Sequence, residues 1–330
     1  MAGKVSGDDL EELVFSRTGV PDDDVLVGPG YGEDAAALQV GEQTLVASSD
    51  PITFAADRIG SLAVTVGTND VAACGATPRW ILPSLFVPDE DNDDNGGSKE
   101  ALDRTVTHLD RAAREAGVAI VGGHTEFTDC ERPLVSTTCL GLADRYIPTS
   151  GVEPGNEIVL TKSAAIEGGA ILATDFEEAL ADDVPDELLD DASAGFADTS
   201  VISEAAVVRE HATAMHDPTE GGVLAGAIEM AVASGVSIAL RRADVPTREA
   251  VEAVCEASGI DPLRTFGSGA LLAAVTAGEG EAAVADCERA GIAAAGIGEA
   301  DEADGDPPGV RLNGTAFERV VRDDLYDLWE

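Results

Sequence analysis

The chain has 330 residues, of which 63 are acidic and 20 basic, so its formal net charge is −43. Its length fits about two domains, and with 44% hydrophobic residues it is too apolar for a disordered chain. The charge excludes a nucleic-acid or anionic-membrane partner, because phosphates would be repelled over most of the surface. No apolar run is long enough for a transmembrane helix, and residues 1–12 lack the apolar core of a signal peptide.

The five cysteines are scattered at long spacings and form no C-x-x-C pair. An odd, dispersed set is typical of reduced intracellular thiols and matches neither a disulfide framework nor a zinc site. We therefore expect a cytoplasmic protein. The five are Cys74, Cys130, Cys139, Cys255 and Cys287.

The first 150 residues alternate between helical and β-prone patterns. Apolar residues at helical spacing predict helices over 8–19, 60–74 and 99–116. Short apolar runs predict strands over 44–48, 80–87, 118–121 and 134–142, and an acidic loop occupies 89–97. The segment 149–155, with its glycines and proline, indicates a boundary, so we expect one domain over 1–150 and another over 151–330.

The second half again alternates strands with helices. Strands are predicted over 157–160, 236–240 and 270–275, and helices over 223–233, 247–257 and 280–290. This alternation favours a mixed α/β layer architecture.

A glycine-rich segment over 28–37 is the first candidate ligand site. Gly30 and Gly32 permit a tight turn and a close approach of the backbone to a ligand, and Asp34 adds a carboxylate. A phosphate would be repelled by acidic side chains unless Mg²⁺ lay between them, because Mg²⁺ prefers oxygen ligands and holds phosphates. The simpler alternative is a turn in which Asp34 is a cap.

Asp50 and Asp70 are two further carboxylates in unusual surroundings. Asp50 ends an apolar strand, a position that often lines ligand crevices in layered α/β folds. Asn69 and Asp70 interrupt an apolar helix, where a carboxylate must be paired, hydrogen-bonded or metal-bound. The alternatives are an Asx turn at Asp50 and a surface-facing Asp70.

The strand predicted over 118–121 leads into Gly122, Gly123, His124 and Thr125. A glycine turn with polar tips suits a bound ligand, and His124 is a candidate general base. A purely hydrogen-bonding His124 is the alternative. The histidines and cysteines show no zinc-ligand spacing.

In the second half, a turn that contains Asp217, Gly221 and Gly222 enters a predicted helix, and a helix N-terminus favours anions. The alternative is that Asp217 or its neighbours only cap the helix. Lys162 is one of three lysines in the chain and follows a predicted strand. Its placement indicates a phosphate or carboxylate contact.

Along residues 28–300 these segments occur in an order that resembles the superfamily of aminoimidazole ribonucleotide (AIR) synthase. The superfamily includes the hydrogenase-maturation protein HypE, thiamine-monophosphate kinase and selenophosphate synthetase, and the sequence resembles HypE-like archaeal proteins in particular. The matching segments are G-x-D-A-A from Gly32, the strand-end Asp50, N-D-V-A-A-C-G-A-T-P from Asn69, G-G-H-T from Gly122, H-D-P-T-E-G-G from His216 and G-S-G-A-L from Gly267.

The resemblance implies an α+β N-terminal domain, whose sheet pairs with that of a second subunit in a homodimer, and an α/β C-terminal domain. It also implies that Mg-ATP binds without a P-loop and that the γ-phosphoryl group goes to an oxygen of a small substrate, often an amide or carbamoyl oxygen. Family positions imply metal ligation by Asp34, Asp50 and Asp70, and an acid–base or orienting role for His124 or Asp217. They imply that nucleotide or substrate contacts Gly30, Gly32, Asn69, Gly122, Gly123, Thr125, Lys162, Gly221 and Gly222.

Three features depart from the family pattern. Glu33 stands where HypE and the thiamine-phosphate kinases usually have Asp, and His124 stands where AIR synthase and HypE have an acid. HypE ends in a cysteine that carries the carbamoyl group, whereas this sequence ends in LYDLWE and its last cysteine is Cys287. We therefore do not expect cyanide-donor chemistry on its own tail.

The sequence thus predicts a cytoplasmic, homodimeric, Mg-ATP-dependent phosphoryl-transfer enzyme with a small-molecule substrate and a maturation protein as a further partner. Two other functions stay open at this point. One is a metabolite kinase resembling thiamine-monophosphate kinase, which would release a phosphorylated product. The other is an ATP-binding partner protein without catalysis.

The acid-rich, lysine-poor composition resembles that of proteins from salt-loving archaea. At molar salt the Debye length falls to about 3 Å, so repulsion among the acidic side chains is screened. We expect the thermal unfolding midpoint to rise between low and molar KCl. An unchanged midpoint would instead indicate an ordinary acidic cytosolic protein.

Overall fold

The computed structural model describes residues 5, 7–53, 58–89, 97–303, 305, 307–319 and 322–329. The acidic loop predicted over 89–97 lies mostly outside them. The chain divides into two compact units. We call Asp22–Gly28 with Ala35–Tyr146 the N-unit, and Met1–Pro21, Pro29–Asp34 and Ile147–Glu330 the C-unit.

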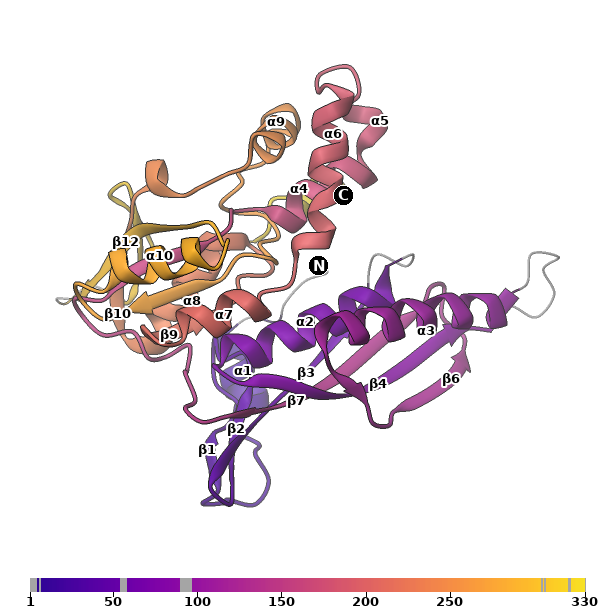
Figure 1. Cartoon of the computed structure of the whole chain (residues 1–330), viewed down its shortest axis with the longest axis horizontal. Helices are drawn as coiled ribbons and strands as arrows, with labels where there is room; N and C mark the ends of the chain where they lie inside the picture. Colours follow the sequence, from indigo (N-terminus) through magenta and orange to yellow (C-terminus); the bar gives the residue numbers. More distant parts are fainter. Residues whose placement is uncertain are drawn as a thin grey trace. The chain divides into compact units, whose positions relative to one another are not determined.

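The N-unit is a seven-stranded sheet with two helices on one face (Figure 1). The strand order is β1-β2-β3-β7-β4-β5, and β6 pairs in parallel with β4. The strands are β1 (Val25–Val27), β2 (Ala36–Val40), β3 (Gln43–Ile52), β4 (Thr77–Pro88), β5 (Ala119–Ile120), β6 (His124–Thr128) and β7 (Leu134–Ala143), and the helices are α2 (Ile59–Ala73) and α3 (Gly97–Ala116).

Helix α2 packs against the sheet and against α3, which lies beside it on the same face, and these two contacts explain why its sequence is apolar over most of its surface. Strand β7 alternates buried and half-buried residues, so Val135 and Cys139 face α2 and join the core. The helices approach closely at Gly60, where an added Cβ would lie 2.3 Å from the carbonyl oxygen of Thr105.

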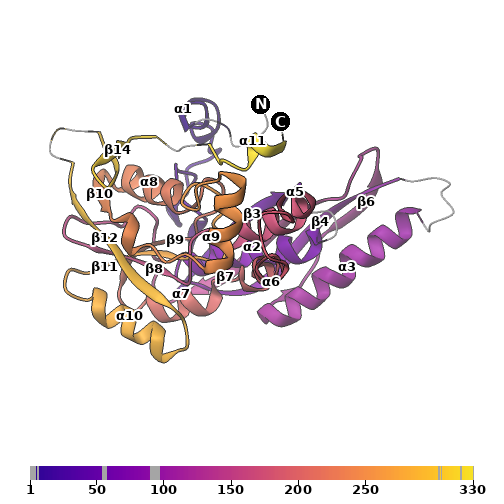
Figure 2. The same ribbon diagram turned by 90° about the horizontal axis from the view of Figure 1, so that it is seen from above.

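The C-unit contains a second seven-stranded sheet, in the order β14-β13-β10-β12-β8-β11-β9. Helix α8 packs on one face of this sheet, and α10 lies with α7 on the other (Figure 2). The strands are β8 (Glu157–Thr161), β9 (Ala212–His216), β10 (Val236–Leu240), β11 (Leu272–Val275), β12 (Ala294–Glu302), β13 (Gly309–Leu312) and β14 (Thr315–Phe317). The helices are α1 (Gly7–Leu10), η1 (Glu11–Phe15), α4 (Ile166–Asp175), α5 (Glu177–Leu180), α6 (Asp186–Ser193), η2 (Ala194–Asp198), α7 (Ile202–Val208), α8 (Gly222–Ser234), η3 (Arg242–Asp244), α9 (Glu249–Ser258), α10 (Gly280–Arg289) and α11 (Tyr326–Trp329).

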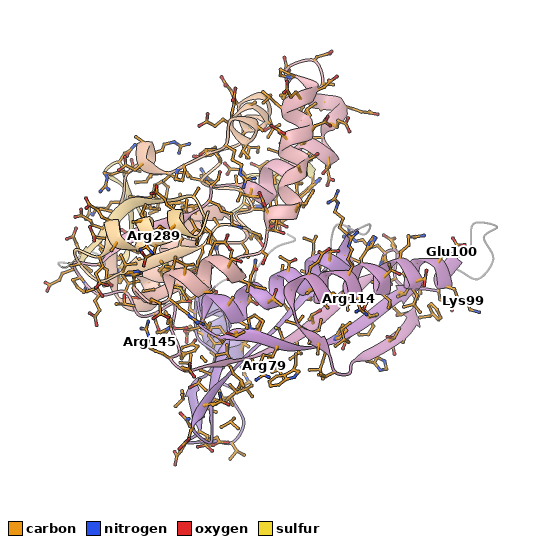
Figure 3. The ribbon with its side chains drawn as sticks, in the orientation of Figure 1. Arg79, Lys99, Glu100, Arg114, Arg145 and Arg289 are labelled. Atoms are coloured by element: carbon orange, nitrogen blue, oxygen red, sulfur yellow. The ribbon has the colours of Figure 1, made fainter. Side chains whose placement is uncertain are left out.

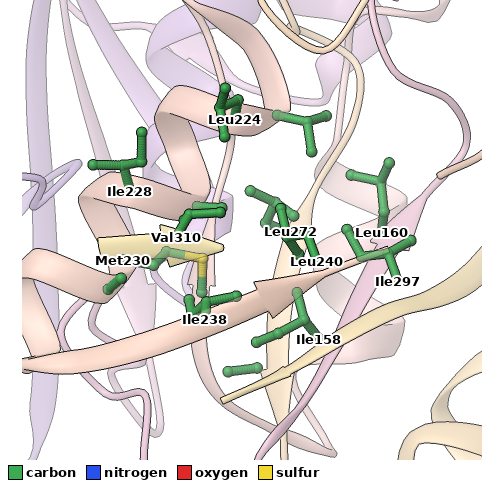
Figure 4. Close-up of a cluster of buried hydrophobic side chains, with 14 of the residues drawn as sticks. Ile158, Leu160, Leu224, Ile228, Met230, Ile238, Leu240, Leu272, Ile297 and Val310 are labelled. Carbon is green, nitrogen blue, oxygen red and sulfur yellow. The ribbon is translucent and has the colours of Figure 1, made fainter. Parts of the chain in front are cut away.

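The core of the C-unit is built from aliphatic side chains of α8 and the sheet (Figure 4). Leu224 and Ile228 of α8 pack with Ile238 of β10 and Leu272 of β11, and all four are buried. Both units combine helices with a sheet, which confirms the predicted mixed fold class.

Most predicted elements are present, and the differences have local causes. Where the sequence predicted one helix over 8–19, the structure has α1 followed by the π-helical turn η1. Leu13 in this segment is 52% exposed, so its apolar side chains do not pack against a core that would stabilise a longer helix. The patterns did not predict β1, β2, β6, β9 or β12–β14. Most of these strands have five residues or fewer, and β12 contains Gly296 and Gly298. No helix in the described part of the chain has the length and apolar character needed to span a membrane.

Gly60 provides a test of the α2–α3 contact. We expect Gly60→Ala to lower the free energy of unfolding by about 1–3 kcal/mol, because the new methyl group would push the backbone of α3 away. Denaturant titration measures the change. Gly296→Ala is the control, because no atom lies within 4 Å of its added Cβ, and equal effects of the two substitutions would contradict the expectation.

Candidate functional site

A cluster in the N-unit joins two of the predicted carboxylates, the half-buried Asp50 and the buried Asp70. Ser48 and Asp50 lie on β3, and Asp70 lies on α2, which covers this face of the sheet. The Ser48 hydroxyl is 2.8 Å from Asp50 Oδ2 and also hydrogen-bonds Asp70 Oδ2. Ser48 is 4% exposed and Asp70 is 7% exposed. Asp70 is therefore not the surface-facing residue of the alternative interpretation.

The chemistry of this cluster suits a divalent cation. Ser48 has one hydroxyl proton but lies against two carboxylates, so it cannot donate a straight hydrogen bond to both at once. Carboxylate and hydroxyl oxygens are the ligands that Mg²⁺ prefers. Within the described ranges, however, no group of three or more His, Cys, Asp or Glu side chains is already arranged to hold a metal. Asn69 is 1% exposed beside Asp70.

The predicted turn 122–125 leads into β6, and the pairing register sets His124 level with Pro51, the neighbour of Asp50, with β4 and β7 between them. His124 is exposed, and its Nε2 is 3.0 Å from Glu126 Oε2. Gly123 has a φ of +139°, and an added Cβ would lie 2.1 Å from the carbonyl oxygen of Pro83. This glycine is therefore explained by close backbone packing against β4.

The predicted loops of the C-unit meet at one edge of its sheet. Strands β8 and β9 run in the same direction on either side of the antiparallel β11, with Leu160 and His216 both opposite Leu272. Their following residues, Lys162 and Asp217, consequently emerge at the same edge. Asp217 is buried there, 2% exposed.

His216 forms two short ion pairs at this edge. Its Nδ1 is 2.7 Å from Asp34 Oδ1, and its Nε2 is 2.9 Å from Glu229 Oε2 on α8. All three side chains are nearly buried: Asp34 is 9% exposed, His216 6% and Glu229 11%. Burial alone would lower the pKa of His216, but the two carboxylates outweigh it and raise this pKa well above its usual range. Burial raises the pKa of Asp34 as well, against a lowering by His216, so the two side chains titrate as an interacting pair.

Glu33, the residue before Asp34, contacts another segment of the C-unit. Glu33 Oε2 accepts a hydrogen bond from the Thr149 amide at 3.3 Å, and Glu33 Oε1 is bonded by the amide and hydroxyl of Ser150. The Thr149 hydroxyl is 3.3 Å from Asp34 Oδ2. The two consecutive acids hold the segment that follows the N-unit.

The Lys162 ammonium is engaged within the protein. Its Nζ donates to the carbonyl oxygens of Asp198 and Ser200 at 2.8 and 2.6 Å, and it lies 3.2 Å from Glu204 Oε1. Lys162 has a φ of +54°, a strained backbone for a non-glycine residue. A phosphate contact by Lys162 requires it to give up one of these three partners.

The glycine turn before α8 is filled by protein groups. Asp323 Oδ2 accepts a hydrogen bond from the Gly221 amide at 2.7 Å, at the helix N-terminus where an anion was expected. An added Cβ on Gly222 would lie 2.5 Å from the carbonyl oxygen of Thr265. The carboxylate of Asp323 thus occupies the position at which the sequence predicted an anion.

Sequence reasoning missed His216 and Glu229 as partners of Asp34. His216 lies in the same H-D-P-T-E-G-G segment as Asp217 but was not singled out. Glu229 is the one acid within the apolar helix α8, the same signal that singled out Asp70. The signal was present, but the pairing of residues 34, 216 and 229 depends on the fold.

A further buried carboxylate, Glu167, lies at the start of α4 and is 3% exposed. Burial raises its pKa to about 7, against a lowering by its hydrogen bond with Ser268, and Asp323 adds a further repulsive contribution. Burial likewise raises the pKa of Asp323 to about 6.

Comparison with known proteins gives one consistent assignment. The family of AIR synthase related proteins matches twice, with its N-terminal domain over residues 32–143 and its C-terminal domain over residues 153–307. The chain is 31% identical to a carbamoyl dehydratase HypE of Cupriavidus necator over 292 residues, which cover 86% of this chain and 78% of that protein.

Two further similarities extend this result. The chain is 28% identical over 287 residues to a protein of Methanocaldococcus jannaschii whose name provisionally assigns it to hydrogenase expression and formation, covering 83% of this chain and 80% of that one. The HypE–HypF complex has a chain with the same fold, with a TM-score of 0.72, 23% identity and coverage of 95% of this chain and 99% of that chain.

Glu167 allows a test by pH. A carboxyl group whose pKa is raised on folding contributes stability that is present below its unfolded pKa and is lost as pH rises through its folded pKa, here from about 4.5 to about 7. Between pH 5 and pH 8 we expect the free energy of unfolding of Glu167→Gln to rise by up to roughly 3 kcal/mol relative to that of the unsubstituted protein. Denaturant unfolding at these pH values measures it. The exposed Glu178→Gln is the control, and a pH-independent difference for Glu167→Gln would contradict the expectation.

Proposed function

The chain belongs to the AIR synthase related protein family, and we propose that it is a Mg-ATP-dependent phosphoryl-transfer enzyme that activates an amide, carbamoyl or similar oxygen of a small substrate. The observation that carries the proposal is the 31% identity to a carbamoyl dehydratase over 86% of the chain. The buried Ser48–Asp50–Asp70 cluster supports it, because phosphoryl transfer depends on positioning and charge neutralisation more than on covalent chemistry by the protein.

Asp50 and Asp70 are the residues that we propose to hold Mg²⁺, with the Ser48 hydroxyl beside them. A bound Mg²⁺ would neutralise phosphate charge, which a protein of net charge −43 does not do by its mean field. Asp34 is the third ligand that we propose, and its Oδ1 lies 2.7 Å from His216 Nδ1. Asn69 immediately precedes Asp70 on α2 and is proposed to contact the nucleotide.

The remaining predicted roles belong to this proposal. Gly122, Gly123 and Thr125 are proposed to lie along the phosphates or substrate. His124 is 62% exposed, and Glu126 orients its ring, so it is accessible to a substrate proton. Asp217 is the buried alternative for the acid–base role.

We also propose a homodimer. Helices α2 and α3 cover one face of the N-unit sheet, whereas large apolar residues on the other face are only half-buried. Such a face is suited to packing against a second copy. These residues are Leu45, Trp80, Leu82, Phe86, Leu140 and Leu142.

A maturation protein is the further partner that we propose, because the HypE with this fold was crystallised with HypF. The cytoplasmic location stays a prediction from the scattered, unpaired cysteines. The product of ATP turnover separates the proposal from a metabolite kinase, which would leave the phosphoryl group on the released product.

The test is Mg²⁺-dependent ATP turnover by the full chain in molar KCl. We expect slow ADP formation, reduced at least about a hundredfold by Asp70→Asn, because the substitution removes a charge that binds metal. The control is Asp110→Asn, which removes a carboxylate paired with Arg114 on the exposed face of α3 (Figure 3).

ATP binding without turnover by the unsubstituted protein would favour the non-catalytic alternative. Equal turnover by Asp70→Asn and Asp110→Asn would contradict the placement of the metal. Failure to bind ATP at all would refute the proposed function.

A further inference from the structure

We propose that Thr137 of β7 is a positioning residue of the metal site, whose hydroxyl holds the Asp50 carboxylate when Asp50 binds Mg²⁺. In this role Thr137 touches neither the ion nor a substrate and acts through Asp50. The inference rests on the proposed function, because it requires a divalent cation at Asp50 and Asp70. The sequence patterns did not single out Thr137.

Thr137 lies directly opposite Asp50 in the N-unit sheet. Strands β3 and β7 are antiparallel neighbours, and Asp50 is paired with Thr137 without a shift of register. Directly opposite residues point to the same face of a sheet, and their Cβ atoms lie about 4.5–5.5 Å apart. A hydroxyl one bond beyond Cβ and a carboxylate oxygen two bonds beyond it therefore come within hydrogen-bond distance when the two side chains turn toward each other.

The hydroxyl of Thr137 is buried and unpaired. The residue is 1% exposed, and its Oγ1 has no hydrogen-bond partner among the described residues. The methyl group of Thr137 faces α2, because it would lie 3.8 Å from an added Cβ on Gly67. A buried hydroxyl without a partner costs free energy. Valine has the same shape and would avoid this cost, so packing alone does not account for a threonine at this position.

Ser48 provides the reason for a second donor in this cluster. Its hydroxyl lies 2.8 Å from Asp50 Oδ2 and also hydrogen-bonds Asp70 Oδ2, yet it has one proton to donate. Carboxylates that bind a metal are themselves usually held by hydrogen bonds, which fix their orientation. When both carboxylates turn toward one ion, Ser48 donates to one of them. Thr137 is placed to donate to Asp50, which leaves Ser48 for Asp70.

The next residue of β7, Thr138, provides a matched comparison. Successive side chains of a strand point to opposite faces, so Thr138 lies on the face that α2 and α3 do not cover. Its Oγ1 is 3.1 Å from Ser49 Oγ, so its hydroxyl is paired. The two threonines therefore differ in the feature that the inference uses, a hydroxyl on the same face as Asp50.

Two measurements on the full chain in molar KCl test the proposal. Denaturant titration without metal gives the equilibrium constant of unfolding. Calorimetric titration with MgCl₂ in the presence of a non-hydrolysable ATP analogue gives the Mg²⁺ concentration at half-saturation. The variants are Thr137→Val, which removes the hydroxyl, and Thr137→Ser, which retains it. Thr138→Val is the control on the same strand, and Asp70→Asn tests the metal site itself.

Without metal, we expect Thr137→Val to lower the unfolding constant about tenfold, because it removes a buried hydroxyl left without a partner in the described part of the chain. The same variant is expected to raise the Mg²⁺ half-saturation about tenfold, because loss of a hydrogen bond to a metal ligand weakens metal binding by about 10–100-fold. Half-saturation in Thr137→Ser and Thr138→Val is expected to stay within about threefold of the unsubstituted value, and that in Asp70→Asn to rise more than about tenfold. A residue with only a structural role would not give a more stable protein that binds Mg²⁺ less tightly.

Unchanged Mg²⁺ half-saturation in Thr137→Val, together with a raised value in Asp70→Asn, would overturn the inference and leave the proposed function standing. An equal loss of Mg²⁺ affinity in Thr137→Ser or Thr138→Val would also overturn it, because the hydroxyl opposite Asp50 would not be the cause. Lower stability of Thr137→Val without metal would show that the hydroxyl already has a partner, with the same consequence. If the unsubstituted protein binds neither Mg²⁺ nor the analogue, the proposed function fails and this inference fails with it.

Discussion

The need to compensate buried carboxylates governs this structure. The surface can carry a large negative charge in water and salt, but a carboxylate inside the fold must find a proton, a cation or hydrogen-bond donors. The chain uses a different solution at each place. Asp34 and Glu229 lie on either side of the His216 ring, Glu204 lies beside the ammonium of Lys162, and Asp323 accepts hydrogen bonds from backbone amides.

The Ser48–Asp50–Asp70 cluster differs from these places because its shared neighbour is a neutral hydroxyl. A divalent cation supplies the kind of charge that such a cluster accommodates, and the same cation attracts the phosphates that an acidic protein repels. The charge of the whole chain and the chemistry of this small cluster therefore favour the same function. Membership of a family with carbamoyl dehydratase relatives agrees with it.

The glycine turns show how one sequence signal can have two physical causes. Glycine is needed where a backbone approaches a ligand, and equally where two backbones of the protein approach each other. Gly123 lies against the Pro83 carbonyl and Gly222 against that of Thr265, so packing accounts for both. Sequence alone does not distinguish these causes, because the neighbour of the glycine comes from a distant part of the chain.

The sequence by itself determined the helices and strands with strong periodicity, such as α2, α3, β4 and β7, and the family to which the chain belongs. It also showed that Asp70 must be compensated, because an apolar helix surrounds it. Only the tertiary structure decided which groups compensate which carboxylates. Residues 34, 216 and 229 are far apart in the chain and become neighbours when the loop docks on the C-unit, so their pairing depends on contacts between distant segments that no local pattern records.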